Sequence, residues 1–576
     1  MKRLIPLASV LLLSCSTPRL TELPSSTAYD IAIRGGTIYD GSGGAPYTGD
    51  VAISGDRIVA VGRFVGLAKV DIDATGKAVA PGFINMLSWA NESLIADGRG
   101  LSDLKQGVTL EVMGEGSSMG PWSPEMIARE TERQGDLKYP ITWTTLGGSL
   151  EALETQGIGP NVASMIGAET ARIHVLGEGD VDPDPTQLGA MRRLVAQAME
   201  DGALGVGTSL IYAPGSYAET DELVALASEA GRCGGIYASH MRYESDRLLD
   251  GVDELIDISR RSGAPGEIWH LKAAGKDNWG KLDAAIARIE AARASGLRIS
   301  ANMYTYIAGS TGFDAAMPPW VQAGGREAWI ARLKDPATRA KVIAEMRDPR
   351  APYENLYRHA GAEGTTMVGF RTEALKPLTG QTLADYARHK GITPEDAMIN
   401  LVIADGSRVQ VVYFLMSEDN IRRQTALPWM TFGSDGAALA AEGVFLKSST
   451  HPRAYGNFAR LLGKYVRDEK ALTLPDAVRR LAAMPAHHLG LRDRGLLKTG
   501  YHADVVVFDP ATVDDHATYD SPHQYSTGVS EVVVNGVLSL QGGEPTGVLG
   551  GRVLRGRAWK GWPGGGCRGS AKDWTW

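Results

Sequence analysis

Apolar and polar positions follow one pattern at the two ends of the chain and another in the long middle. At the N-terminal end, short runs that alternate apolar and polar residues predict four strands, at residues 31–33, 37–39, 51–53 and 58–61. Turns between strands are predicted at Gly35-Gly36 and Gly55-Asp56. The C-terminal end repeats the strand pattern at residues 503–508 and 531–536. These two β-rich ends predict one small β-sandwich domain built from residues 30–80 and 491–549.

The middle of the chain, residues 81–490, alternates strand-like apolar runs with segments of helical spacing. This order is typical of an α/β fold and predicts a (β/α)8 TIM-like barrel. The candidate barrel strands end at Asn85, Gly114, Gly167, Ser209, His240, His270, Tyr304 and Asp435. The interval between the last two ends is too long for one strand and one helix, so a subdomain at about residues 325–372 is predicted to be inserted over the barrel mouth. Residues 550–576, rich in Gly, Trp and Arg, are predicted to form an irregular tail.

The first residues have the features of an export signal. Met1-Lys2-Arg3 is basic, and residues 4–13 form an apolar run that is too short to span a bilayer. The run ends in Leu12-Leu13-Ser14-Cys15, which resembles a bacterial lipobox with Cys15 as the lipidated residue. We therefore expect a lipoprotein signal peptide at residues 1–15, a tether at 16–29, and a periplasmic protein anchored to the membrane only through lipid. An ordinary cleaved signal peptide is the alternative.

Composition narrows the possible partners and the redox chemistry. The chain has 576 residues, 43% of them apolar and 22% charged, which is ordinary for a globular protein. A net charge of −8 and the lack of a basic run argue against a nucleic-acid-binding surface. If Cys15 is modified, Cys233 and Cys567 remain. Two unpaired thiols are the default prediction, and a disulfide is possible in an oxidising compartment.

Two histidines stand where a parallel barrel presents its functional groups. His240 and His270 each follow an apolar strand-like run and precede a polar loop. Active residues of such barrels lie at the carboxyl ends of the strands. Neutral imidazoles at two neighbouring strand ends are suited to binding a divalent metal. The competing interpretation is a pair of partly buried histidines that hydrogen-bond within the fold.

Two carboxylates occupy similar positions. Glu115 follows the second predicted barrel strand, at residues 110–114, and would complete a three-ligand set, because catalytic zinc usually takes three protein ligands and a water. An exposed loop glutamate is the alternative. Asp435 follows the apolar run 429–433 and would act as a general base. An Asp-Gly pair, however, commonly caps a turn.

Together with longer motifs, these residues resemble the D-aminoacylase (N-acyl-D-amino-acid deacylase) family of the amidohydrolase superfamily. The likeness covers nearly the whole chain after Tyr29, and the opening of residues 30–41 is typical of the β-domain of the superfamily. The more specific motifs are Ser239-His240-Met241-Arg242-Tyr243-Glu244, His270-Leu271-Lys272, Gly433-Ser434-Asp435-Gly436, His451-Pro452-Arg453-Ala454-Tyr455-Gly456 and the segment 503–510.

The resemblance implies an amidohydrolase barrel with His240 and His270 as ligands of a tightly bound zinc. The third ligand in the family is a cysteine in a Gly-Asn-Cys-Gly turn. This chain has Gly114-Glu115-Gly116, which is one residue shorter, so Glu115 is the expected substitute.

The resemblance also implies roles around the metal. Asp435 matches the catalytic aspartate of the family. Lys272 and Tyr304 match positions that hold the carboxylate of the substrate, and Arg453 lies in a loop that the family uses near the substrate.

The chain departs from the family in two places. The His-X-His pair at the end of the first barrel strand is replaced by Leu87 and Trp89, and no histidine precedes His174, so the second, weaker metal position is lost. Both replacements are expected to line the pocket, with Trp89 as an aromatic wall. The Gly-His pair near the third strand reads Gly167-Ala168, which removes one polar contact.

We therefore predict a mononuclear enzyme with one Zn²⁺ per chain, held by Glu115, His240 and His270, with Asp435 as the base. It would hydrolyse the carboxamide bond of an N-acyl-D-amino acid or of a small peptide-like amide with a free carboxylate. A dipeptide, a lactam or another cyclic amide is the alternative among hydrolases. A catalytically silent binding protein is the alternative from another class. The presence of His240, His270, Asp435 and Lys272 argues against it.

Overall fold

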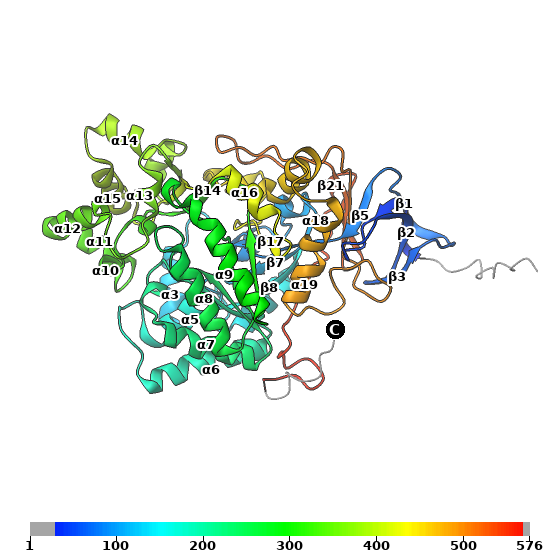
Figure 1. Ribbon diagram of the computed structural model, residues 1–576, viewed down its shortest axis with the longest axis horizontal. Coiled ribbons are helices and arrows are strands. Elements are labelled where there is room, and N and C mark those ends of the chain that lie inside the picture. The colour runs from blue at the N-terminus through cyan, green and yellow to red at the C-terminus, as the bar shows by residue number, and fades with distance from the viewer. Residues whose placement is uncertain (1–28, 568–576) are drawn as a thin grey trace, which may run out of the picture.

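The computed structural model describes residues 29–567. A barrel lies in the middle of the molecule, a β-domain at one end and a mostly helical subdomain at the other (Figure 1). The predicted signal peptide at residues 1–15, the tether up to residue 28 and the last part of the predicted tail, 568–576, lie outside the described residues. Among the helices of residues 29–567, none combines the length and apolar character needed to cross a membrane.

Both ends of the chain contribute to one nine-stranded sheet. The strand order is β21-β20-β19-β18-β5-β1-β2-β3, with β4 paired to β1. The two ends meet where β18 runs antiparallel to β5. The strands are β1 (Tyr29–Ile38), β2 (Tyr47–Ser54), β3 (Arg57–Gly62), β4 (Ala68–Asp73), β5 (Ala78–Pro81), β18 (Val505–Phe508), β19 (Val529–Val534), β20 (Val537–Gln541) and β21 (Glu544–Pro545).

The predicted turn at Gly35-Gly36 is wrong. The strand β1 continues through both glycines, and its register against β2 shifts between Ile33 and Gly36. Gly35 has a φ of 69°, which accommodates the irregularity without ending the strand.

A parallel barrel occupies the middle of the chain. Its strands are buried along their whole length, as expected for parallel strands covered on both faces. They are β6 (Phe83–Asn85), β7 (Val108–Met113), β8 (Asn161–Ser164), β9 (Ile166–Gly167), β10 (Gly205–Ser209), β11 (Ile236–His240), β12 (Gly266–Ile268), β13 (Ile299–Met303) and β17 (Met430–Phe432). Each of the eight predicted strand ends lies within three residues of an observed one.

Backbone hydrogen bonds close this barrel. The short strands β8 and β9 are two parts of one barrel strand, interrupted at Met165, whose N–H donates to the carbonyl of Met113 at 2.8 Å. Strand β6 meets β17 through the N–H of Met86, which donates to the carbonyl of Phe432 at 3.1 Å. The strands therefore form an eight-membered ring, and the predicted fold class is confirmed.

Helices pack around the outside of the barrel (Figure 1). Several begin with a side-chain cap, such as α6, where Asp184 and Gln187 form a capping box and Pro185 takes the first helical position. The helices are α1 (Ala90–Ala96), α2 (Leu101–Leu104), α3 (Pro124–Arg133), α4 (Leu146–Gln156), α5 (Ala168–Leu176), α6 (Pro185–Asp201), α7 (Thr220–Arg232), α8 (Leu248–Ser262), α9 (Leu282–Ala294), α16 (Glu418–Thr425), α17 (Arg453–Arg460), α18 (Leu474–Leu481) and α19 (Ala483–His488).

A separate three-stranded sheet and its helices interrupt the barrel between β13 and β17. The sheet contains β14 (Ala308–Gly312), β15 (Thr365–Gly369) and β16 (Gln410–Phe414), and it has an apolar core of its own. The segment predicted as an insertion, about residues 325–372, is the central part of this longer stretch. Its helices are α10 (Pro319–Gln322), α11 (Arg326–Lys334), α12 (Pro336–Arg347), α13 (Leu356–Ala360), α14 (Leu383–Lys390) and α15 (Pro394–Asp405).

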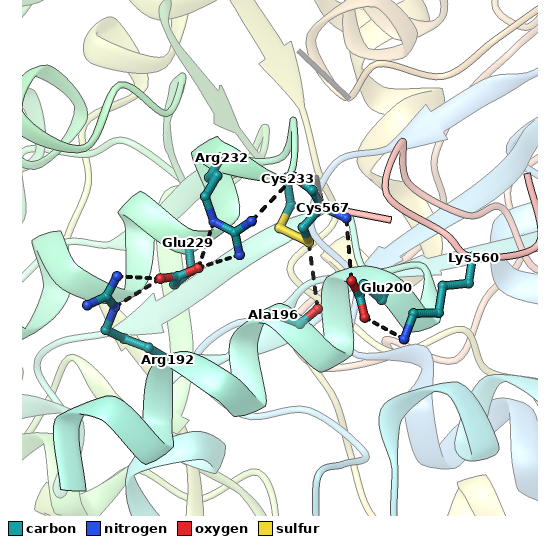
Figure 2. Close-up of a disulfide and its surroundings, with 8 residues drawn as sticks. All are labelled: Arg192, Ala196, Glu200, Glu229, Arg232, Cys233, Lys560 and Cys567. Atoms are coloured by element: carbon teal, nitrogen blue, oxygen red, sulfur yellow. Dashed lines mark hydrogen bonds and ion pairs between the residues drawn. A yellow bond between two sulfur atoms is a disulfide. The ribbon is translucent and has the colours of Figure 1, made fainter. Parts of the chain in front are cut away.

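The two remaining cysteines are joined, so the default prediction of unpaired thiols is wrong. Cys233 follows α7, Cys567 lies in the C-terminal segment, and the two form a disulfide across a sequence separation of 334 residues (Figure 2). The ammonium of Lys560 pairs with Glu200 on α6 at 2.6 Å nearby. The segment reaches this position along the barrel, where the N–H of Val162 on β8 donates to the carbonyl of Arg552 at 3.0 Å.

Candidate functional site

A cavity of about 660 Å³ lies at the carboxyl ends of the barrel strands, against the inserted subdomain. Its size is within the range of small-molecule sites. Seven of the eight residues predicted for the site lie at or just beyond the ends of six barrel strands, and the eighth, Arg453, begins α17. All of them line this one cavity: Trp89, Glu115, His240, His270, Lys272, Tyr304, Asp435 and Arg453.

Glu115 enters the cavity because the chain turns sharply just before it. Gly114 has a φ of 105°, and a Cβ at that position would lie 2.5 Å from the carbonyl oxygen of Met165. Only glycine permits so close an approach with this backbone conformation. The turn places the buried carboxylate of Glu115 beside the ends of β11 and β12.

Two imidazoles and one carboxylate converge at this point. Oε1 of Glu115 lies 2.9 Å from Nδ1 of His240 and 3.0 Å from Nε2 of His270. A ligand atom from each residue lies within 4.8 Å of the other two, and this is the one such group that residues 29–567 contain. Zinc bonds of roughly 2.0–2.2 Å in tetrahedral geometry keep ligand atoms about 3.3 Å apart. The three side chains therefore fit a divalent metal with small adjustments.

The charges of these groups also fit a cation. Burial by itself raises the pKa of the Glu115 carboxyl, but the charge of His270 and hydrogen bonds from both imidazoles outweigh burial and hold that pKa well below its ordinary value. Burial and Lys272 act to lower the pKa of His270, whereas nearby carboxylates, Glu244 first, raise it to about 9. The protons that the imidazoles share with carboxylates are the ones that a bound metal would replace.

Glu244, which the sequence interpretation missed, fixes both imidazoles from the far side. Its Oε1 lies 3.1 Å from Nδ1 of His270, and its Oε2 lies 3.4 Å from Nε2 of His240. The ammonium of Lys272 donates to Glu244 at 2.6 Å and lies 2.8 Å from Nδ1 of His270. Carboxylates commonly orient metal-binding histidines in this way. The sequence signal for this role was the position of Glu244, four residues after His240 in the motif Ser239–Glu244.

Asp435 faces the metal-site candidate across the cavity, so its side chain does more than cap a turn. Its Oδ1 accepts a hydrogen bond from Nε1 of Trp89 at 3.1 Å, and its Oδ2 pairs with Nη1 of Arg453 at 2.8 Å. Burial, the largest influence, raises the pKa of Asp435, with Arg453 acting against it. A carboxylate with a raised pKa beside a metal site is suited to moving protons.

Arg453 and Tyr304 form a second polar wall. The guanidinium of Arg453 lies over the ring of Tyr304, 4.5 Å from its centre. His451 sets the start of α17, because its Nδ1 accepts from the N–H of Arg453 at 3.0 Å and its Nε2 lies 2.9 Å from the carbonyl oxygen of Ala308. Burial holds the pKa of His451 well below its ordinary value, so this imidazole is neutral.

The two replacements of the family's histidine pair have different positions. Trp89 lines the cavity, with 38% of its surface exposed. Its indole N–H donates to Oε2 of Glu115 at 2.9 Å as well as to Asp435. Leu87 is fully buried in the barrel interior, packed with Met86 and Leu110, so the prediction that it lines the pocket is wrong.

Glu169 is a second residue that the sequence interpretation missed. It lies in the first turn of α5, directly after the Gly167-Ala168 pair, and it lines the cavity. Its Oε1 accepts from the backbone N–H of Ser209 at 2.8 Å, and its Oε2 has no hydrogen-bond partner among the described residues. Burial raises its pKa to about 7.

Comparisons with known proteins identify the family of the chain. The amidohydrolase family profile matches residues 71–539. An N-acyl-D-glutamate deacylase of Alcaligenes xylosoxydans xylosoxydans is 33% identical over 531 residues, which cover 91% of this chain and 96% of the relative. The chain belongs to the amidohydrolase family, in its D-aminoacylase branch.

Solved structures show the same likeness. One is an N-acyl-D-glutamate deacylase from Bordetella bronchiseptica, bound to zinc and to a phosphonate inhibitor that mimics the tetrahedral intermediate. It has a TM-score of 0.76 and 29% identity, and the match covers 92% of this chain and all of that one. Another is a D-aminoacylase described as having a binuclear metal centre, with activation by one metal and attenuation by a second. It has a TM-score of 0.75 and 30% identity over the same coverage.

Proposed function

We propose that the protein is a zinc-dependent deacylase that hydrolyses an N-acyl-D-amino acid to a carboxylate and a D-amino acid. One observation carries this proposal: Glu115, His240 and His270 converge in the cavity. The indole N–H of Trp89 links Asp435 to Glu115, so the predicted base lies beside the predicted ligands. The substrates named for the relatives, an N-acyl-D-glutamate and the substrates of a D-aminoacylase, support the choice of substrate.

The residues predicted for the site have separate tasks in this reaction. A zinc ion bound at the three ligands would lower the pKa of water toward roughly 7 and polarise the scissile carbonyl. Asp435 accepts the proton of the attacking water and delivers it to the leaving amine. Glu244 and Lys272 hold the imidazole of His270 in place from behind.

Arg453 and Tyr304 bind the free carboxylate of the substrate in this proposal, with Lys272 as a further positive charge nearby. The guanidinium already lies at the cavity wall over the tyrosine ring. Because they hold one end of the substrate, these residues would determine which enantiomer the site accepts. A hydrolysis screen over paired D and L N-acyl amino acids tests the proposal, and equal rates on both series, or none, contradict it. Dipeptides and cyclic amides in the same screen test the alternative hydrolases.

The flat face of Trp89 would form the wall for the acyl group. Its exposed fraction of 38% in the cavity supports this use. The Trp89→Ala variant is expected to lose roughly 10- to 100-fold in kcat/KM on a large hydrophobic substrate and less on a small one. An unchanged ratio between the substrates, with a lower melting temperature, would mean that Trp89 only packs.

We also propose that the protein is exported and anchored through Cys15. The Cys233–Cys567 disulfide supports export, because disulfides persist in oxidising compartments. Fractionation of cells that carry Cys15→Ala tests the anchor. The variant should leave the membrane fraction with its activity intact, whereas a wild-type protein already soluble after export contradicts the lipid anchor.

A further inference from the structure

The carboxylates of Glu115, which is buried, and of Asp435, which is partly buried, share one donor beside the metal-site candidate. The indole N–H of Trp89 donates to Oε2 of Glu115 at 2.9 Å and to Oδ1 of Asp435 at 3.1 Å. We propose that this N–H takes the place that a second cation would occupy between the two carboxylates. Trp89 is then a positioning residue that restricts the centre to one metal ion. The inference rests on the proposed function and goes further, because it gives a structural reason for the site to bind one metal ion and not two.

All four oxygens of the two carboxylates have a partner in the protein. At Glu115, Oε1 faces the imidazoles and Oε2 accepts from the indole. At Asp435, Oδ2 pairs with Arg453 and Oδ1 accepts from the indole. Each carboxylate therefore turns one oxygen toward the other, and the shared N–H is the group that both oxygens contact.

Such an arrangement without its donor would attract a cation. Oε2 of Glu115 and Oδ1 of Asp435 contact the same indole nitrogen, so the two carboxylates lie close together. Like charges that are removed from water repel each other strongly, and a carboxylate oxygen that loses its donor is left without a partner. A divalent ion between two carboxylate oxygens would relieve both effects, since oxygen ligands suit divalent cations.

The indole is held in this position by the backbone. The backbone N–H of Trp89 donates to the carbonyl of Gly436 at 2.9 Å. Ser88 forms a β-bridge with the same glycine, which follows Asp435. Leu87 points into the apolar barrel interior and supplies no ligand. The two carboxylates are therefore the ligands that a second ion would find here, and Trp89 lines the same cavity as both of them.

The test removes the donor and keeps an aromatic ring. In Trp89→Phe, Glu115 and Asp435 keep their charges but lose the shared N–H. Trp122→Phe is the matched control. Trp122 lines the same cavity, but its N–H donates to the backbone carbonyl of Ser118 at 3.1 Å and contacts neither carboxylate.

Metal-free protein of each variant is titrated with zinc by calorimetry, and bound zinc is measured by elemental analysis after equilibration with excess zinc. Wild type and Trp122→Phe should saturate at one equivalent. Trp89→Phe should take up two, the second more weakly than the first. Adding Asp435→Asn to Trp89→Phe removes one carboxylate and should return the stoichiometry to one.

The outcomes separate this inference from the proposed function. If wild type binds no zinc, the proposed function fails. If wild type and a folded Trp89→Phe both stop at one equivalent, or if wild type already binds two, the role of Trp89 is overturned. Circular dichroism verifies folding, and Trp89→Leu, which also lacks the donor, takes the place of Trp89→Phe if that variant does not fold.

Discussion

Glu111 and Glu115 lie four residues apart, on β7 and just beyond it, and both are buried, yet their charge states differ. Burial, the largest influence, raises the pKa of Glu111 to about 7. Its partners are neutral donors such as Asn85, whose Nδ2 donates at 2.9 Å, together with the carboxyl of Asp103. At Glu115 the two imidazoles reverse the effect of burial and hold the carboxylate ionised.

The same contrast separates Glu244 from Glu267. Burial raises the pKa of Glu267 to about 7, and the hydroxyl of Ser300 and the amide of Asn302 are its neutral donors. Glu244 is equally buried, but His240, first among the charges, and Lys272 hold its pKa well below the ordinary value.

Burial of a carboxyl group therefore does not mark the active site of this barrel. Glu111 and Glu267 lie within the barrel strands β7 and β12, away from the cavity lining, whereas Glu115 and Glu244 line the cavity. What distinguishes the second pair is a cationic partner together with access to the cavity.

Removing an imidazole should have the largest effect, because it makes Glu115 resemble Glu111. His240→Ala or His270→Ala leaves two protein ligands, so tight zinc binding and turnover should both be lost. Elemental analysis and a deacylation assay measure these effects. A variant that keeps its zinc would show that the histidine it lacks is not a ligand.

Asp435→Asn keeps the ligands and removes the base. Zinc should remain bound while kcat falls by roughly 100-fold or more, the loss expected for a missing general base. Rates and zinc content are measured on the same preparation. A normal rate in this variant would refute the assignment of Asp435.

Glu244→Gln tests the support behind the imidazoles. The amide keeps the shape of the side chain but loses the charge that holds His270, so zinc affinity should fall roughly 10- to 100-fold. Competition with a chelator measures the affinity. Glu267→Gln, outside the cavity, is the control and should bind zinc as wild type does. Equal affinities in the two variants would remove Glu244 from the metal site.

Glu267→Gln should instead change the dependence of stability on pH. A carboxyl whose pKa is raised on folding contributes stability that is complete below its unfolded pKa and is lost as pH rises through its folded pKa, here about 7. Glutamine lacks this loss. Relative to wild type, the variant should therefore gain up to about 3 kcal/mol between pH 5 and pH 8.5, the equivalent of a shift from 4.5 to about 7. Urea unfolding at both pH values measures the difference, and no change between them would mean that Glu267 is charged in the folded protein.

The barrel and the residues at its mouth could be predicted from the sequence because parallel strands are continuous apolar runs that end together. That rule brought His240, His270 and Asp435 into one place. It says nothing about side-chain direction, so it could not place Leu87 in the core or aim the indole N–H of Trp89 at two carboxylates.

Contacts between distant segments were beyond the sequence for a different reason. The pairing of Cys233 with Cys567 depends on where the C-terminal segment crosses the barrel, and no local pattern encodes that path. Glu169 likewise acquires its raised pKa from burial by the surrounding fold. The continuation of β1 through Gly35 is fixed by its pairing with β2, which outweighs the local turn signal.

The disulfide makes the second half of the molecule a covalent ring. Strands β11, β12, β13 and β17 and the inserted subdomain lie inside it, and β6 to β10 lie outside. A protease that cuts the exposed turn of 3-10 helix at Gly443–Lys447, where 53% of the Leu446 side chain is accessible, would break the ring once without releasing a fragment. The nicked protein would migrate as one species on a denaturing gel without reductant and as two after reduction, so a gel run without reductant would not reveal the cut.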